Sequence, residues 1–401
     1  MFEKKRMERN CLKRLTKMTL CIAIVLLLYQ VIFLHKDMPS FKRISKQHFK
    51  WNLTASKMDE LNSSFRQRNE YRVMVTRKVS DRYSEFGIMG SLLCPNDTNF
   101  KETFMENINL VHNYPLGTSV SYLKQLGFDI DSNYLEKENP KIPVFVTAAS
   151  SNHFLEMQGL IQNLHDVVFP KYTNLNFIIY DIGFNATEQQ MVQRHCRCEY
   201  RSFPFEKYPG HVKVISGYTW KPLIAQILLN EFGFIIWIDT SIRFRNGELD
   251  SLFEMGIKHG IKIGEGSLGI GYRTDPITFN FLGEHPCLYA DKNEMETGLF
   301  LIYRTRFTVQ TIMRPWLSCA LTSGCMYFQG SLARIECRES KELGICHRFE
   351  QSVLGIILWR LYHADINSVV IPKRNEIFDV QRGHISRYFD SLEKNTITIH
   401  N

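Results

Sequence analysis

The sequence lacks the short motifs that identify several common functional classes. No Cys-x-x-Cys pair recurs at the spacing of zinc ligands, which argues against a zinc site. No Gly-x-Ser-x-Gly elbow occurs, and Gly330-Ser331 lacks the flanking residues, so a serine hydrolase is disfavoured. Internal repeats and low-complexity runs are absent. The alternation of strand and helix patterns described below also argues against a receptor built from β-sandwich repeats.

A basic surface is also missing from most of the chain, although the net charge of the 401 residues is +8. Residues 1–80 carry 18 Lys and Arg against 6 Asp and Glu, whereas the other 321 residues carry 31 against 35. The basic excess therefore belongs to the N-terminal arm, and the rest is mildly acidic. This distribution argues against a nucleic-acid partner.

The N-terminal arm has the pattern of a membrane anchor. Met18 to Leu34 is an uncharged run of 17 residues, and seven basic residues precede it. That length is at the short end for a spanning helix, and the positive flank predicts a cytosolic N-terminus. A cleaved signal peptide would need a small-residue cleavage site, and the stretch from Tyr29 to His35 offers none. We therefore predict a cytosolic tail over 1–17, a transmembrane helix over 18–34, a stem over 35–90, a lead-in segment over 91–141 and a lumenal domain over 142–401.

Two further features agree with a lumenal body. Four N-x-S/T sequons follow the predicted anchor, at Asn52, Asn62, Asn96 and Asn185. Eight cysteines also lie beyond it, and an even number in an oxidising compartment indicates disulfides. Cys319 with Cys325 and Cys337 with Cys346 would close short loops. Eight cysteines allow 105 pairings, so the connectivity stays open.

The pattern from residue 142 onwards predicts an α/β domain with a mostly parallel sheet. Apolar, β-rich runs over 143–149, 176–181, 198–203 and 234–238 alternate with helical patterns. The helices are expected over 154–164, from a capping box at 187–190, and from 219 onwards. Later stretches predict a short helix near 249–259, a glycine-rich loop or edge strand over 261–271, a polar turn at 296–298 before a strand to 303, and a helix over 349–362.

The run Phe234 to Ile238 is apolar without a break and predicts a strand buried on both faces. It ends at Asp239, which Thr240 and Ser241 follow. Ligands of open α/β sheets bind beyond the carboxyl ends of the strands, so Asp239 is a candidate for binding a cation or a sugar. A turn or capping role for Asp239 explains the same residues about equally well.

These features together resemble the Golgi glycosyltransferases of the GT-A fold, over roughly residues 142 to 390. Asp239-Thr-Ser241 is similar to the Asp-x-Asp motif of those enzymes, with serine in place of the second acid. Glu296-Thr-Gly298 resembles their acceptor-side turn, Glu350-Gln351 their active-site helix start, and His384 their C-terminal metal ligand. The chain also resembles an uncharacterised, nematode-expanded family of glycosyltransferase-like proteins.

The resemblance implies a UDP- or GDP-linked sugar donor, a glycan acceptor, and a Mn²⁺ or Mg²⁺ ion held by Asp239 and His384. Glu350 would act as the general base, or would simply be a helix-start carboxylate. The residues expected to contact donor or acceptor are Lys221, Trp220, Ser241, Arg243, Glu296 and Gln351. For Lys221 a solvated surface role is the alternative, and for Trp220 a core role. Asp181, at the end of an earlier strand, is more often a turn residue than a nucleotide contact.

The function expected from these features is that of a single-pass type II membrane glycosyltransferase of the Golgi or endoplasmic reticulum. It would move a sugar from the nucleotide donor to a glycan, glycoprotein or glycolipid. The alternative is a catalytically inactive or lectin-like binding protein on the same anchored scaffold. The serine at position 241 is the main feature in favour of that alternative.

Overall fold

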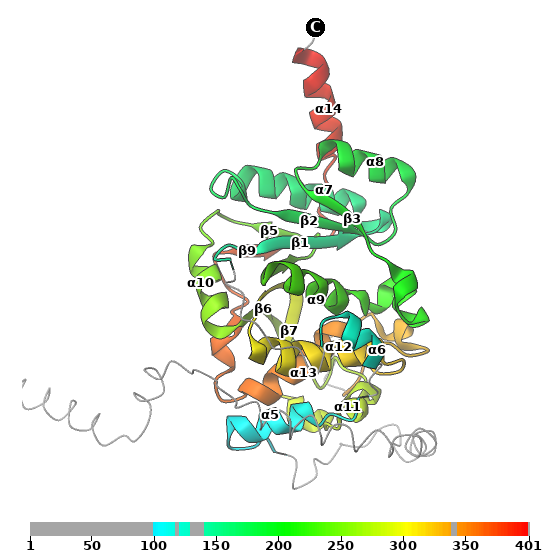
Figure 1. The fold of residues 1–401 in the computed structure, drawn as a ribbon, viewed down its shortest axis with the longest axis vertical. Coiled ribbons are helices and arrows are strands. Elements are labelled where there is room, and N and C mark those ends of the chain that lie inside the picture. The colour runs from blue at the N-terminus through cyan, green and yellow to red at the C-terminus, as the bar shows by residue number, and fades with distance from the viewer. Residues whose placement is uncertain (1–98, 117–119, 129–139, 338–342, 400–401) are drawn as a thin grey trace, which may run out of the picture. The chain divides into compact units, whose positions relative to one another are not determined.

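The computed structural model describes residues 99–116, 120–128, 140–337 and 343–399, all of which lie in one compact unit. Its centre is a seven-stranded sheet in the order β3-β2-β1-β4-β7-β6-β8 (Figure 1). All strands run in the same direction except β7, which is antiparallel to both of its neighbours. The prediction of a mostly parallel α/β sheet is therefore confirmed. The strands are β1 Val144–Ala149, β2 Phe177–Asp181, β3 Glu199–Ser202, β4 Phe234–Ile238, β6 Ile261–Gly269, β7 Asn293–Tyr303 and β8 Val370–Ile371.

A second, smaller sheet lies beside the carboxyl end of β4. It pairs β5, Ile242–Phe244, with β9, Phe378–Val380, in antiparallel register. This pairing brings the C-terminal part of the chain next to the loop after β4, although the two segments are far apart in the sequence. The C-terminal segment thereby becomes part of the candidate site.

Helices cover both faces of the large sheet (Figure 1). Alternate residues of the central strands point to opposite faces, so β4 contributes Ile235 and Trp237 to one hydrophobic core and Phe234, Ile236 and Ile238 to the other. The first core contains residues of α9, α12 and α13, and the second contains residues of α7, α8 and α10. The helices are α5 Phe104–His112, α6 Val120–Gln125, α7 Phe154–Asn163, α8 Ala186–His195, α9 Trp220–Phe232, α10 Asp250–His259, α11 Pro276–Leu282, α12 Arg314–Leu321, α13 Phe349–Tyr362 and α14 Tyr388–Ile399.

Local expectations were wrong at three places. The capping box of α8 uses Asn185 and Glu188, not Thr187 and Gln190, because the helix begins at Ala186. The glycine-rich stretch forms strand β6, which lies between β7 and the short β8. Glu296 to Gly298 lies within β7, where Glu296 pairs with Gly264, and is not a turn before the strand.

Three disulfides occur in the described part of the chain. They join Cys196 to Cys198, Cys319 to Cys325, and Cys337 to Cys346. The second and third are the short loops that the spacing suggested, whereas the first was not anticipated.

Several predictions fall on residues that the structure does not describe. These are the cytosolic tail, the anchor over 18–34, the stem, and the sequons at Asn52, Asn62 and Asn96. Among the described helices, none has both the length and the apolar character needed to cross a membrane. Asn185 is described and exposed, and its side-chain oxygen caps α8 by accepting a hydrogen bond from the Glu188 amide at 3.0 Å.

Candidate active site

The candidate site lies where the order of the sheet reverses. From β1 the chain moves outward through β2 and β3, and then returns to place β4 on the other side of β1. The loops after β1 and β4 therefore leave the sheet in opposite directions and open a crevice between them. Asp239 is the first residue after β4, so the sheet itself places this carboxylate at the crevice.

Three contacts fix Asp239. Its backbone amide donates a hydrogen bond to the Gly298 carbonyl at 2.7 Å, and its Oδ1 accepts from Trp237 Nε1 at 2.7 Å and from Lys221 Nζ at 3.0 Å. The second oxygen, Oδ2, is 3.5 Å from the position that a Cβ on Gly298 would occupy. Oδ1 is thus committed to the protein, while Oδ2 faces the side of the cavity that glycine leaves open.

Lys221 is buried between two carboxylates. Its Nζ lies 3.0 Å from Asp239 Oδ1 and 3.1 Å from Glu350 Oε1, with only 2% of the lysine side chain exposed. Burial opposes the charge on Lys221, but the two carboxylates raise its pKa above the ordinary value. Burial also raises the pKa of Glu350, although Lys221 and a 2.8 Å hydrogen bond from Thr297 Oγ1 act against it. The triad joins the start of α9, the end of β4 and the start of α13.

Two residues next to this triad have left-handed backbone conformations that side chains rarely adopt. Tyr218, just before α9, has φ 52°, and Phe349, the first residue of α13, has φ 44°. Their rings are 5.9 Å apart, so the two positions also contact each other. Such conformations cost about 1–3 kcal/mol each and persist only when the surrounding packing imposes them. The backbone is therefore constrained at the starts of α9 and α13, close to Lys221 and Glu350.

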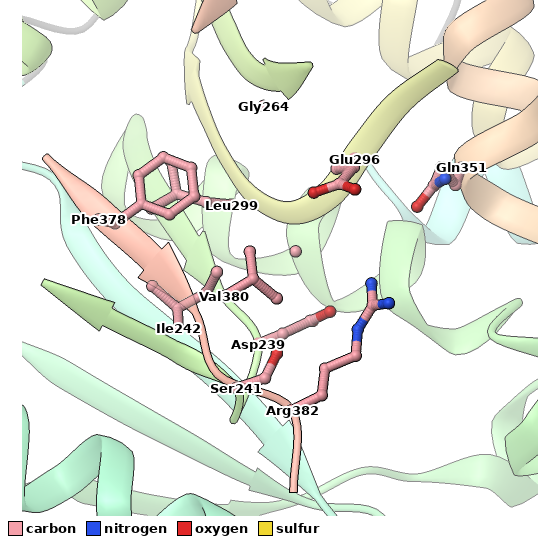
Figure 2. A pocket seen from close by; sticks show the side chains of 11 residues that line it. Asp239, Ser241, Ile242, Gly264, Glu296, Leu299, Gln351, Phe378, Val380 and Arg382 are labelled. Carbon is pink, nitrogen blue, oxygen red and sulfur yellow. The ribbon is translucent and has the colours of Figure 1, made fainter. Parts of the chain in front are cut away.

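The crevice holds a polar cavity of about 350 Å³, counting the solvent-open space at its mouth. Figure 2 shows carboxylate, amide and guanidinium groups directed into it from separate parts of the chain. The cavity is lined by the loop after β4, β5, β6, β7, the first turn of α13, β9 and the residues after β9. The lining residues are Asp239, Ser241, Ile242, Gly264, Glu296, Gly298, Leu299, Gln351, Phe378, Val380 and Arg382.

The segment after β9 is held against α7 by hydrogen bonds between side chains and the backbone. Gly383 N donates to Glu156 Oε1 at 2.8 Å, and Arg243 Nη2 donates to the carbonyl oxygens of Glu156 and His384 at 3.0 and 3.1 Å. Burial would raise the pKa of Glu156, but hydrogen bonds from His153, Thr240 and Gly383 bring it down to about 2. An ionised carboxylate and a buried guanidinium thus fix the position of this segment.

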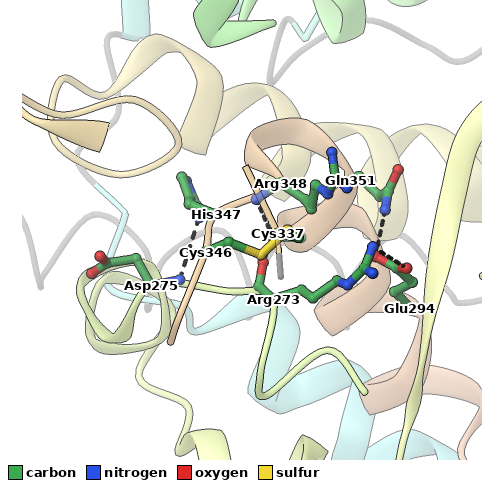
Figure 3. Close-up of a disulfide and its surroundings, with 9 residues drawn as sticks. Arg273, Asp275, Glu294, Cys337, Cys346, His347, Arg348 and Gln351 are labelled. Atoms are coloured by element: carbon green, nitrogen blue, oxygen red, sulfur yellow. Dashed lines mark hydrogen bonds and ion pairs between the residues drawn. A yellow bond between two sulfur atoms is a disulfide. The ribbon is translucent and has the colours of Figure 1, made fainter. Parts of the chain in front are cut away.

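Two arginine side chains lie beside the start of α13, next to the cavity residue Gln351 (Figure 3). Arg273 Nη1 pairs with Glu294 Oε1 at 2.9 Å, and Gln351 Nε2 donates to Glu294 Oε2 at 2.8 Å (Figure 3). Arg348 lies beside them, and burial, together with the nearby charges of Arg273 and Arg382, lowers its pKa. The disulfide Cys337–Cys346 lies at the start of the short segment that carries Arg348 into α13 (Figure 3).

Residues 119–226 match a family model described as "Protein of unknown function (DUF1647)". No curated protein matches the chain. Among solved structures, core-mannan synthase A (CmsA/Ktr4) from Aspergillus fumigatus, in its Mn/GDP form, is 9% identical, with a TM-score of 0.37 and coverage of 64% of this chain and 80% of that one.

Two other solved structures have lower TM-scores against this chain. Mouse xyloside xylosyltransferase 1 is 13% identical, with a TM-score of 0.34 and coverage of 57% of this chain and 84% of that one. The galactosyltransferase LgtC, solved with donor and acceptor sugar analogues, is 15% identical, with a TM-score of 0.29 and coverage of 43% of this chain and 59% of that one. All three are glycosyltransferases. Because the three TM-scores are below 0.5, the function proposed below is argued from the site alone.

The structure brings together four of the residues that the sequence suggested. Asp239, Ser241, Glu296 and Gln351 all line the one cavity. They come from three separate segments, and the fold makes them neighbours. Their roles in binding or catalysis stay predictions.

Other suggested residues lie behind the cavity wall. Trp220 is buried in the core and donates through Nε1 to the Ile215 carbonyl at 2.8 Å. Lys221 and Glu350 form the buried ion triad, so Lys221 is not the solvated residue that its position in the first turn favours. Arg243 donates through Nη1 and Nη2 to four backbone carbonyls and is 6% exposed. Its guanidinium is therefore directed at the backbone, away from the lining residues.

Asp181 and His384 are also placed by the structure. Both oxygens of Asp181 are engaged: Oδ1 accepts from the Gly183 and Phe184 amides, and Oδ2 from Tyr200 and Gln189. This is the turn role that its sequence favours. His384 is exposed and does not belong to the cavity lining.

The described residues do not fit a divalent cation held by the protein. No three of the described His, Cys, Asp and Glu side chains lie close enough together to hold a metal ion. Mn²⁺ and Mg²⁺ prefer oxygen ligands in six-coordinate sites, and the cavity lining offers only the carboxylates of Asp239 and Glu296 and the hydroxyl of Ser241, with one oxygen of Asp239 already bound to Lys221 and Trp237. No step below is assigned to a metal.

Arg382 is the main site residue that sequence reasoning missed. It lines the cavity from the exposed segment after β9. A single arginine in a polar C-terminal stretch has no local signal that separates it from a solvated surface residue. Only the pairing of β9 with β5 brings Arg382 to the cavity.

Proposed function

We propose that this chain is a glycosyltransferase that moves a sugar from a nucleotide-diphosphate donor to a glycan acceptor. The observation that carries the proposal is the polar cavity at the switch point of the sheet. There Asp239 is fixed through one oxygen by Lys221 and Trp237, and the other oxygen is left for a ligand. A carboxylate oriented in this way is suited to hold a sugar or ribose hydroxyl.

The lining residues have different roles in such a transfer. Asp239 and Ser241, at the end of β4, bind hydroxyl groups of the donor. Glu296 is the second carboxylate of the lining, so for an inverting reaction we assign it, and not the buried Glu350, to take the proton from the acceptor hydroxyl. Glu350 holds Lys221, and Lys221 in turn orients Asp239. In that role Glu350 is a positioning residue.

The proposal includes a type II orientation in the Golgi or endoplasmic reticulum, with the domain in the lumen. Three disulfides in the described residues support an oxidising compartment. Exposure of Asn185 at the start of α8 is compatible with a glycan on its amide nitrogen.

Asp239→Asn in the full-length chain, purified in detergent, tests the enzymatic proposal. Asparagine keeps an oxygen for Lys221 and Trp237 but removes the negative charge. We expect release of UDP or GDP from nucleotide sugars to fall by about 100-fold or more, a loss typical of a group that acts at the reacting centre. The control is Asp291→Asn, the same change on a carboxylate whose side chain is 76% exposed. Unchanged turnover in Asp239→Asn would remove this residue from the mechanism.

A second candidate function is an anchored lectin-like binding protein without catalysis. Two observations favour it: Ser241 stands where the resemblance expects a second acid, and Glu350 is held by Lys221. Gly298→Ala separates this candidate from the enzyme. The added methyl would lie 3.5 Å from Asp239 Oδ2 and would obstruct a ligand there. Loss of glycan binding in Gly298→Ala, in a protein that releases no nucleotide from any donor, would favour the binding protein.

A further inference from the structure

Arg382 is a cation directed into a cavity that otherwise contains two carboxylates. Figure 2 shows its guanidinium extending from the segment after β9 toward Glu296 and Gln351. It forms no hydrogen bond or ion pair with any residue in the described part of the chain. An extended guanidinium without a protein partner, at the rim of a polar cavity, is available to an anionic ligand.

A second arginine lies behind it. Arg348 Nε is buried and has no hydrogen-bond partner among the described residues. Burial lowers the pKa of Arg348, and the nearby charges of Arg273 and Arg382 lower it further, while the carboxylates of Glu294 and Glu350 act against them. Three guanidinium groups thus share a region in which only Arg273 is paired with a carboxylate.

The backbone on each side of Arg382 is fixed. Gln381 N donates to the Ser241 carbonyl at 2.7 Å, and Gly383 N donates to Glu156 Oε1 at 2.8 Å. These two hydrogen bonds hold the residue between them over the end of β4. The loop that carries Asp239 therefore also determines where the Arg382 side chain begins.

We propose that Arg382, with Arg348 behind it, binds the diphosphate of the donor and neutralises its charge in place of a protein-held metal ion. This inference rests on the proposed function. When the acceptor oxygen bonds to C1 of the sugar, the C1–O bond to the diphosphate breaks and its electron pair goes to the leaving oxygen. The acceptor's proton passes to the carboxylate base. A planar guanidinium matches phosphate oxygens with two parallel hydrogen bonds, so it stabilises the departing anion directly.

The test is calorimetric binding of UDP and GDP to the full-length chain in detergent, once with EDTA and once with Mn²⁺. We expect at least one nucleotide to bind in EDTA, with little gain from Mn²⁺. Arg382→Ala should weaken that binding by about 10- to 100-fold, the usual effect of losing hydrogen bonds to a charged group. Arg382→Lys should recover part of the lost affinity, because lysine restores the positive charge but not the two parallel N–H donors of a guanidinium.

Arg374→Ala is the matched control. It removes an exposed arginine from the same C-terminal region, outside the cavity lining, and should leave the affinity unchanged. Binding that requires Mn²⁺, or that Arg382→Ala leaves intact in EDTA, would overturn the inference while the proposed function stands. Absence of nucleotide binding in both EDTA and Mn²⁺ would overturn both.

Discussion

Charged groups behind the cavity wall differ from those at its rim in what surrounds them. Lys221, Glu350 and Arg243 are at most 6% exposed, and each is bonded to protein groups from other elements of the fold. Arg382, at the rim, is exposed and has no partner among the residues described. The first set fixes the backbone, and the second is available to a ligand. Substitutions behind the wall should therefore change stability, and those at the rim should change binding.

The largest expected effect comes from removing the cation of the buried triad. Lys221→Met leaves the buried Glu350 without its counter-charge and Asp239 Oδ1 without one of its donors. Breaking a buried pair in this way costs about 3–5 kcal/mol of unfolding free energy. Urea unfolding of Lys221→Met and of the parent protein measures the loss of unfolding free energy.

Two further variants sharpen that measurement. Adding Glu350→Gln to Lys221→Met removes the uncompensated carboxylate and should recover part of the stability. Lys171→Met is the control, because Lys171 pairs with Glu248 and Asp250 at the surface and its loss should cost much less than that of Lys221. Equal losses in Lys221→Met and Lys171→Met would contradict the distinction between buried and exposed charges.

A smaller effect, dependent on pH, is expected at Glu156. Its pKa is about 2 in the folded protein, below the ordinary value of 4.5, so its contribution to stability is complete above pH 4.5 and is lost as the pH falls toward 2. Glu156→Gln should therefore lower the unfolding free energy at pH 7 by about 2–3 kcal/mol. The difference from the parent protein should shrink between pH 4.5 and 2.

Unfolding curves at pH 7, 4 and 2.5 would show this convergence. A difference between Glu156→Gln and the parent that stays constant over that range would mean that the carboxylate charge does not hold the segment after β9. The prediction concerns stability, so it can be checked without a substrate.

The smallest effect is expected for the exposed pair of Arg245 and Asp379, which joins β5 to β9. Arg245 Nε donates to Asp379 Oδ2 at 2.9 Å, with the two side chains 47% and 40% exposed. A double-mutant cycle of Arg245→Ala and Asp379→Ala should give a small coupling energy that decreases as salt is added. A large coupling energy that does not depend on salt would contradict this prediction, because it would mean that the pair behaves like the buried charged groups.

Local patterns predicted the framework of the fold well. β1, β2 and β4 have unbroken or nearly unbroken apolar runs, and the helices between the strands have recognisable starts, so the βα alternation could be inferred. The same patterns left β6 open between a loop and an edge strand, because three glycines interrupt the alternation and pairing with β7, not the strand's own propensity, decides its structure.

The sequence alone determined that a buried strand ends in Asp239, because five consecutive apolar residues followed by polar ones leave few other structures. It did not determine which side chains meet that carboxylate. Lys221 and Glu350 come from the starts of two helices, and Arg382 arrives through the pairing of β9 with β5. Such contacts join residues far apart in the chain, and their energies depend on burial that only the packed tertiary structure creates.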